Sequence, residues 1–485
     1  MNGVFAIMFV RMGVMLLMWA LTACERGTGE PPQDGPPDSG TTPTGCFRPP
    51  SEAAKTPEWG FQFGTKKSEE FLDVALDAKG RLYLAGYENG DVGAARFDPS
   101  GDSRGVLFHM AHTADQVLLP HKDKIIDIPG TTETIDALVF HPDTGDLYFT
   151  GRTTGSFNPT HGAVAEFTHQ GQQDFYVAGP HGSDREVILY QGGTSYPQHP
   201  NRLAFDAQGD LIVSGFDDFY VPSGTHYVER WEDPFVTKLK RSANGPALTQ
   251  AWTKSFDTSY TDTLGGLAVD LQRDSGIYVT GNISAGPQRG AFVRKLDNTR
   301  EGELGPVWRQ SPISMDTIQA AQFLPDGNLL IAGATMGIMG EKSHGEQDVV
   351  LRLLNMNPEK GALGEILWTK QYGSPGADFV TDMTVDTQGH IIVVGETLDS
   401  VLEHDPLANK GQQDVFLMMF DKDGERLATR QWGSEGDDHP NAVAVDQCGE
   451  IFIVGYTTGD LQPPVPPYEK GERDAFLIAS TMTRP

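Results

Sequence analysis

The chain repeats one pattern of apolar and polar positions. Each copy has a short apolar run, a polar turn that contains glycine, a second apolar run and a closing glycine. Short runs rich in β-branched and aromatic residues on both sides of such a turn predict a β-hairpin. Seven copies occupy residues 74–86, 138–151, 203–215, 267–281, 321–333, 383–395 and 443–455. The closing glycines recur at intervals from 52 residues (Gly281 to Gly333) to 66 residues (Gly215 to Gly281).

Two further apolar segments belong to each repeat. The third is predicted at 93–98, 162–167, 233–239, 290–297, 348–354, 414–421 and 474–480. The fourth often ends in an aromatic residue and is recognised at 58–64, 252–257, 368–373 and 429–433, and in diverged form at 124–130 and 187–193. Four strands in each of seven repeats predict an all-β fold, a seven-bladed β-propeller with four-stranded blades.

The phase of the repeats predicts how the ring closes. The repeated region begins with a fourth strand, 58–64, and ends with a third strand, 474–480. Pairing these two strands would complete the last blade and remove the exposed edges of an open array. The connections at 216–233, 396–413 and 456–473 are expected to be long loops, where binding functions of rigid scaffolds concentrate.

The first residues are expected to direct export. Residues 1–23 contain an apolar run too short to cross a bilayer but long enough for a signal peptide. The sequence Leu21-Thr22-Ala23-Cys24 resembles the lipobox of bacterial lipoproteins, which implies that Cys24 is lipidated and attaches the mature chain to a membrane. Residues 24–57 are rich in Pro, Gly and Thr and predict a flexible tether. The propeller is expected to span 58–485.

The repeat itself resembles a known family. The pattern W-x-x-x-aromatic-G, an acid, A-V-D-x-x-G-x-I-x-V-x-G and then D-x-F is similar to the bacterial seven-bladed β-propeller repeat family, and residues 366–480 match it best. The resemblance implies the propeller fold and an exported or cell-surface setting. It implies no activity, because the biochemical role of that family is largely undefined.

The net charge of the chain and the chemistry of its side chains narrow the functions that it could have. The chain has 37 Lys and Arg against 66 Asp and Glu, a net charge of −29, which argues against nucleic acid as a partner. No convergent set of acid, base and cation residues is recognised, so no catalytic residue is predicted. The leading hypothesis is a monomeric, lipid-anchored envelope protein that binds an unidentified protein or glycan. A propeller enzyme, either a lyase or similar to quinoprotein dehydrogenases, and a structural envelope component are the alternatives.

One polar column recurs eight residues before the end of each first strand. It holds six acids and one amide: Glu69, Glu133, Gln198, Asp262, Asp316, Asp378 and Asp438. A ring of carboxylates on one face of the disc would suit Ca²⁺, which prefers oxygen ligands. Alternatively, each acid accepts backbone N–H bonds and caps its own loop, a device that every blade needs.

Two cysteines remain besides Cys24. Cys46 lies ahead of the predicted closing strand, and Cys448 lies in the turn of the last hairpin. If strand 58–64 docks on the last blade, the two could form a disulfide that secures the tether to the propeller. A zinc site is not expected, since the sequence has no C-x-x-C pair.

Overall fold

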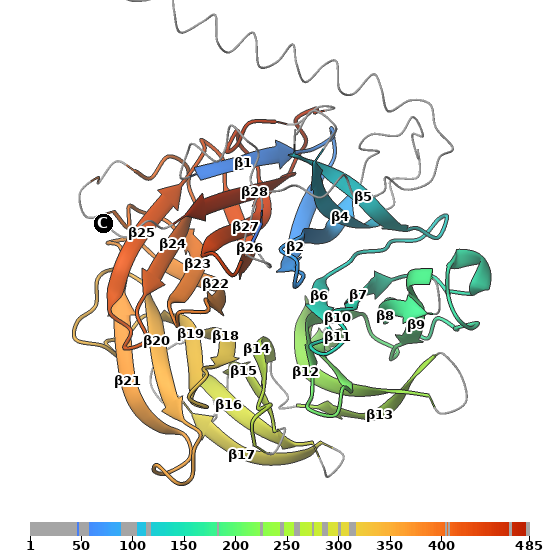
Figure 1. Cartoon of the computed structure of the whole chain (residues 1–485), viewed down its shortest axis with the longest axis horizontal. Coiled ribbons are helices and arrows are strands. Elements are labelled where there is room, and N and C mark those ends of the chain that lie inside the picture. The colour runs from blue at the N-terminus through green and yellow to red at the C-terminus, as the bar shows by residue number, and fades with distance from the viewer. Residues whose placement is uncertain are drawn as a thin grey trace, which may run out of the picture.

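The fold is described from a computed structural model of the chain. The described residues are 46–47, 58–88, 104–112, 118–181, 184–223, 227–242, 247–256, 262–273, 276–283, 290–298, 302–309, 317–402, 405, 408–464 and 468–481. Their strands form seven four-stranded antiparallel sheets arranged around a central axis (Figure 1). The prediction of an all-β, seven-bladed propeller is confirmed.

The first three blades contain twelve strands in chain order. Blade 1 comprises β2 (Glu69–Leu76), β3 (Leu82–Glu88), β4 (Arg104–His112) and β5 (Leu118–Ile126). Blade 2 comprises β6 (Ala137–Phe140), β7 (Leu147–Thr153), β8 (Asp174–His181) and β9 (Asp184–Gly192). Blade 3 comprises β10 (Gln198–Phe205), β11 (Leu211–Ser223), β12 (Tyr227–Arg241) and β13 (Leu248–Ser255).

The remaining blades follow the same order, with the first strand nearest the axis. Blade 4 comprises β14 (Asp262–Val269), β15 (Ile277–Ile283), β16 (Gly290–Asp297) and β17 (Glu303–Arg309). Blade 5 comprises β18 (Thr317–Phe323), β19 (Leu329–Thr335), β20 (Asp348–Asn355) and β21 (Glu365–Tyr372). Blade 6 comprises β22 (Asp378–Val385), β23 (Ile391–Thr397), β24 (Asp414–Phe420) and β25 (Arg426–Trp432). Blade 7 comprises β26 (Asp438–Val445), β27 (Glu450–Thr457), β28 (Asp474–Thr481) and β1 (Glu58–Phe63).

The ring closes as the repeat phase predicted. Strand β1 pairs antiparallel with β28, from Glu58 opposite Ser480 to Phe63 opposite Ala475. In Figure 1 the blue β1 lies against the red β28, so the first and last strands share one sheet. The joint is buried, because Phe61 and Phe63 belong to the same hydrophobic cluster as Leu477 and Phe71. Closure therefore ties the start of the domain to its end.

The second and third strands provide most of the core. Strands β20 and β24 are buried along their whole length. Their side chains alternate between the two faces of a blade, and each face packs on a neighbouring blade, as Leu351 of blade 5 and Phe416 of blade 6 do within one cluster. This two-sided burial explains why these segments appear in the sequence as nearly continuous apolar runs.

Two predicted third strands were wrong. In blade 1 the third position is filled by β4, and the predicted segment 93–98 lies outside the described residues. In blade 2 it is filled by β8, while 162–167 belongs to the connection that follows a short 3₁₀ helix (Pro159–His161). Strand β8 begins with Asp174, whose buried carboxylate accepts a hydrogen bond from Gln191 of β9. The segment 162–167 begins instead with Gly162, which ends the 3₁₀ helix in a left-handed conformation.

The prediction of a long loop at 216–233 was also wrong. Strands β11 and β12 extend through most of this region as one hairpin, with Asp217 opposite Asp233 and Ser223 opposite Tyr227. The segment is rich in aromatic and β-branched residues, which favour strands, and the two strands pair along its length.

Two faces of the disc are distinguished by their connections. The turns between first and second strands lie at one end of every blade, which we call the hairpin-turn face. The connections from a second to a third strand, and from one blade to the next, lie at the opposite end, the long-connection face. None of the helices in the described residues has the length and hydropathy to cross a bilayer.

Candidate functional site

The acidic column lies at the long-connection face, at the start of the innermost strands. Glu69, Asp262, Asp378 and Asp438 are the first residues of their strands, and Gln198 is the first residue of β10. Glu133 precedes β6 and forms an isolated bridge with Thr153. Asp316 lies outside the described residues.

Four of these acids bind the loop just before them: Glu69, Glu133, Asp378 and Asp438. Asp438 accepts bonds from the backbone N of Ser434 at 2.6 Å and from its hydroxyl at 3.0 Å, and also from the Thr457 hydroxyl. Asp378 has the same arrangement with Ser374. Glu69 accepts from the backbone N and hydroxyl of Thr65 at 2.7 and 2.6 Å. These contacts are those of a loop cap that recurs from blade to blade.

Burial changes the acidity of the column. It raises the pKa of Glu69 and of Glu133 to about 7, and that of Asp378 to about 6, although hydrogen bonds from the loops oppose the shift. Within the described part of the chain, no group of three or more His, Cys, Asp or Glu side chains is arranged to hold a metal ion.

A second buried device was not anticipated from the sequence. In blades 2, 5, 6 and 7 the third strand begins with an Asp that accepts a hydrogen bond from a Gln of the outermost strand in the same blade. The pairs and their N···O distances are Gln62–Asp474 (2.9 Å), Gln191–Asp174 (2.9 Å), Gln371–Asp348 (2.7 Å) and Gln431–Asp414 (3.0 Å). The Gln oxygen accepts from the backbone of the neighbouring connection, as Gln431 does from Val401 N at 2.9 Å. In the sequence, the Gln that precedes the aromatic residue in W-T-K-Q-Y-G could have indicated these pairs.

The residues next to the column form one cross-strand pair in each blade. Because the first strands surround the axis (Figure 1), these pairs encircle its end at the long-connection face, and we call them the axial ring. The pairs are Glu70–Tyr87, Thr134–Arg152, His199–Phe216, Thr263–Asn282, Thr317–Ala334, Phe379–Glu396 and His439–Tyr456. Blades 4 and 5 contribute smaller side chains, whereas the other five contribute large charged or aromatic ones.

Blades 6, 7 and 1 are linked across this ring by polar contacts. His439 Nδ1 lies 2.5 Å from Glu396 Oε2, and the His439 ring stacks on Tyr456 with centroids 4.6 Å apart. The guanidinium of Arg473 lies over the Tyr456 ring at 4.3 Å and 3.5 Å from Glu70 Oε2. Glu70 also accepts a bond of 2.8 Å from the Tyr87 hydroxyl. Burial, followed by the neighbouring Glu70, raises the pKa of Tyr87.

Blades 2 and 3 continue the network. Arg152 donates two bonds to Asp136, at 2.9 and 3.0 Å, and its third nitrogen lies 3.0 Å from Nδ1 of His199. His199 stacks on Phe216 at 4.7 Å, and its Nε2 lies 3.8 Å from Asp218. Burial disfavours the charge of Arg152, but Asp136 more than offsets this and raises the pKa of the guanidinium.

The opposite end of the axis has a different surface. A cavity of 400 Å³ lies at the hairpin-turn face among blades 4, 5 and 6, and its walls include Leu267, Leu271, Phe323 and Val385. Its lining also includes Asp270 and Asp386, each paired with a basic side chain of its own turn, Arg273 and His390.

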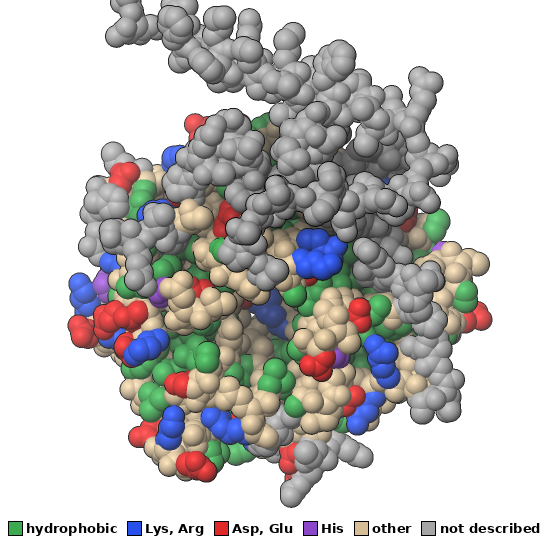
Figure 2. All heavy atoms as spheres, viewed as in Figure 1, with side chains coloured by type: hydrophobic (Ala, Val, Ile, Leu, Met, Phe, Trp, Pro, Cys, Tyr) green, Lys and Arg blue, Asp and Glu red, His purple; other side chains and the backbone are tan. Residues whose placement is uncertain are grey.

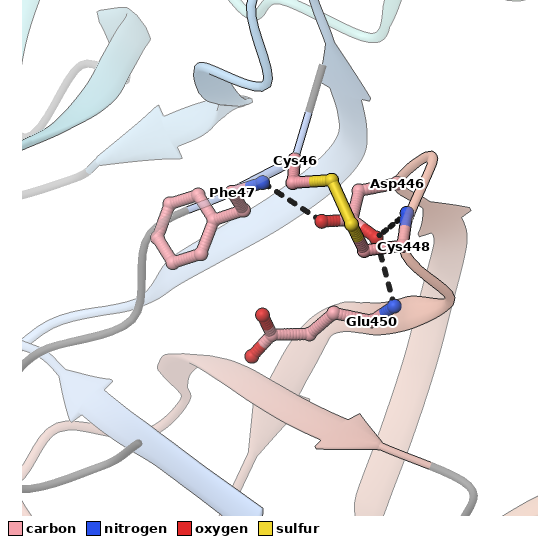
Figure 3. The surroundings of a disulfide bond; sticks show 5 residues. All are labelled: Cys46, Phe47, Asp446, Cys448 and Glu450. Atoms are coloured by element: carbon pink, nitrogen blue, oxygen red, sulfur yellow. Dashed lines mark hydrogen bonds between the residues drawn. A yellow bond between two sulfur atoms is a disulfide. The ribbon is translucent and has the colours of Figure 1, made fainter. Parts of the chain in front are cut away.

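The two cysteines that the sequence brought together are bonded in the structure. The Sγ atoms of Cys46 and Cys448 are 1.94 Å apart (Figure 3), on the hairpin-turn face. Phe47 is buried there, and its backbone N donates to Asp446 at 2.8 Å. A Cβ on Gly80, which has φ +79°, would lie 2.5 Å from the Cys46 carbonyl, so the segment also rests on the first turn of blade 1. Cys24 lies outside the described residues.

Comparisons with known proteins assign neither a family nor an activity to the chain. No protein-family model matches the chain, and no curated protein matches its sequence. Sqt1 from Chaetomium thermophilum is 12% identical, covers 87% of this chain and 97% of its own, and has a TM-score of 0.47. The periplasmic gluconolactonase PpgL of Pseudomonas aeruginosa is 14% identical, covers 82% and 99%, and has a TM-score of 0.47. The α-L-arabinanase of Penicillium chrysogenum is 13% identical, covers 70% and 91%, and has a TM-score of 0.40.

Proposed function

We propose that this chain is a lipid-anchored protein of the bacterial cell envelope whose propeller binds a macromolecular partner through the axial ring, without catalysing a reaction. The observation that carries the proposal is the contrast between repeated and unrepeated residues. The acid caps and the Gln–Asp pairs recur from blade to blade, as structural devices must. The axial ring differs in every blade, and its differences are concentrated in charged and aromatic side chains.

The attachment point of the tether supports this choice of face. The bond between Cys46 and Cys448 lies on the hairpin-turn face, opposite the axial ring. If Cys24 carries the lipid, residues 25–45 separate the membrane from that face, and an extended chain of that length reaches up to roughly 70 Å. The axial ring would then point away from the membrane, toward its partner.

Site-specific photocrosslinking in intact cells tests the face. The full chain carries a benzoylphenylalanine either at Thr263 of the axial ring or at Gln388 of a hairpin turn. Both sites are accessible without disturbing a charged pair: Thr263 is half-buried and Gln388 exposed. We expect a discrete crosslinked species from position 263 and none from 388. Crosslinking only from 388 would contradict the proposal.

The envelope location needs its own experiment. Cell fractionation of the full chain and of Cys24→Ser should show the first in the membrane fraction and the second released from it. If both fractionate alike, the lipid anchor is wrong. This result is independent of which face binds the partner.

One observation favours an enzyme as the second candidate. The contact between His439 and Glu396 would orient the imidazole through Nδ1, an arrangement that suits a general base. A lyase of this kind forms an unsaturated product that absorbs in the ultraviolet. Such absorbance from an acidic polysaccharide, lost in His439→Gln, would establish an enzyme in place of a binding protein. A bound quinone, detected by its own absorbance, would instead support the dehydrogenase alternative.

A further inference from the structure

We infer that the ligand of the axial ring is a neutral glycan. This inference rests on the proposed function and specifies the chemistry of the same site. It follows from three properties of the ring: its charges are paired, its aromatic rings are stacked and partly accessible, and one sector of it is lined by small residues.

The charges of the ring and its immediate contacts are neutralised in pairs. Each Arg or His lies beside a carboxylate: Arg473 with Glu70, His439 with Glu396, Arg152 with Asp136 and His199 with Asp218. An anionic ligand would have to compete with these carboxylates for the guanidinium groups. A cation would have to compete with the guanidinium groups for the carboxylates. A hydroxyl group does neither, because it can donate to a carboxylate and accept from the adjacent guanidinium at the same time.

The same residues provide flat surfaces. His439 stacks on the ring of Tyr456, and the guanidinium of Arg473 also lies over that ring. His199 stacks on Phe216. Tyr456 and Phe216 are half-buried rather than enclosed, so part of each side chain reaches solvent. The C–H face of a pyranose packs on planar groups of this kind, and the hydrogen-bonding pairs lie beside them. Neighbouring side chains already hold these aromatic rings and ion pairs in place, so fewer side chains lose conformational freedom when a ligand binds.

The asymmetry of the ring leaves room for a chain of sugars. Blades 4 and 5 present the half-buried Thr263, Asn282 and Thr317, and Ala334 opposite Thr317 is buried, where the other blades present Arg, His, Tyr, Phe or Glu. Beyond Ala334, the connection to β20 exposes Met336 and Ile338, whose side chains are 55% and 71% accessible. A glycan lying along this sector would contact small and apolar groups at one end and the paired charges at the other.

A peptide is less well matched to this surface. Peptides are recognised by an added strand at a sheet edge or by apolar pockets for anchoring side chains. The first strands are sheet edges, but these edges face the axis, which Arg202 of blade 3 and Asp382 of blade 6 bridge. Most of the large side chains around them are charged or hydrogen-bonded. Protein binding is therefore an outcome of the test that would overturn the glycan.

The experiment uses the full chain in detergent micelles and isothermal titration with neutral hexasaccharides of glucose, xylose and N-acetylglucosamine. The hexamer of galacturonic acid serves as an anionic counterpart. The test variants are Arg473→Gln and Tyr456→Leu. The matched control is Arg81→Gln on the hairpin-turn face, because Arg81 also has a carboxylate partner, Asp77, and lies 5.8 Å from the centre of a tyrosine ring, Tyr83.

We expect at least one neutral hexasaccharide to bind, and each test variant to weaken its affinity tenfold or more without lowering the thermal midpoint. Arg81→Gln should leave the affinity unchanged. Binding of the galacturonic acid hexamer alone would overturn the inference, and so would binding that Arg81→Gln and Arg473→Gln reduce equally. The absence of saccharide binding would overturn it too. In that case a crosslinked protein at position 263 would retain the proposed binding function, whereas no crosslink would remove both.

Discussion

Arg202 of blade 3 contacts Asp382 of blade 6 across the central axis, with Nη2 3.4 Å from Oδ1. The two blades are not neighbours, so the contact joins strands β10 and β22, 180 residues apart. Two carboxylates near this contact also tie adjacent blades together. Asp382 accepts from the backbone N of Val443 at 3.0 Å, and Asp73 accepts from that of Leu138 at 2.7 Å. The middle of the propeller is therefore bridged by side chains, and blue atoms of Lys or Arg are seen inside the hollow at the centre of the disc (Figure 2).

Removing Arg202 should destabilise the protein more at pH 8 than at pH 5. Burial raises the pKa of Asp73 to about 7, and Arg202 opposes that shift. A carboxyl whose pKa is higher in the folded state binds more protons there than in the unfolded state between about pH 4 and 7. Its contribution to stability is thus present at low pH and is lost as the pH rises through 7. We expect Arg202→Met to cost about 2 kcal/mol at pH 8, which lies above the pKa of Asp73, because a hydrogen bond to a charged group contributes about 1.5–3 kcal/mol.

Urea unfolding at pH 5 and pH 8 measures this difference. Arg81→Met, which removes an Arg from an ion pair on the hairpin-turn face, is the control and should cost at most about 1 kcal/mol at either pH. An equal loss of stability for Arg202→Met at the two pH values would contradict the role given to the axial carboxylates.

The Gln–Asp pairs should contribute measurably to folding. Gln431→Leu removes the donor to Asp414 and the acceptor for Val401 N, and both of those groups are buried. A buried polar group left without its partner costs about 1–3 kcal/mol, so we expect a loss of that size. Gln388→Leu in an exposed turn should change stability by no more than about 0.5 kcal/mol. Equal denaturant midpoints for the two variants would show that the Gln431–Asp414 pair does not stabilise the fold.

Reduction of the disulfide should loosen the closure between the tether and blade 7. The double variant Cys46→Ser, Cys448→Ser is expected to lose about 2–4 kcal/mol, a typical value for a bond that restricts the unfolded chain. The wild-type protein in a reducing agent should unfold at the same midpoint as the double variant. Peptide mapping under non-reducing conditions provides the direct check, and two free thiols would contradict the bond.

Calcium separates the two interpretations of the acidic column. The oxygens of Glu69, Asp378 and Asp438 already accept hydrogen bonds from their own loops. We therefore expect the thermal midpoint to be the same in EDTA and in millimolar Ca²⁺. A saturable rise would show that the native state binds the ion, since a ligand at a hundredfold excess over Kd stabilises it by about 2.7 kcal/mol. Loss of that rise in Asp378→Asn would assign it to the column.

The parts of the fold that depend on neighbouring residues were predictable from the sequence. A hairpin such as 383–395 is specified locally: the Asp386 side chain accepts from the backbone of the turn, and Gly389 adopts φ +85°. Seven such hairpins at a steady period predict the blade number, and the phase of the first strand predicts the closure with β28. The errors lay where local pattern is weak, at the third strands of blades 1 and 2 and in the extended hairpin of blade 3.

The axial ring was decided by tertiary structure alone. Arg473, Tyr456 and Glu70 come from opposite ends of the chain and have no common motif. They meet because ring closure places blade 7 beside blade 1 and because strand register brings His439 opposite Tyr456. Repetition reveals what every blade needs, since a device used seven times leaves a period in the sequence. A binding site assembled once, from residues that differ between blades, leaves no period and becomes visible only when the blades surround a common axis.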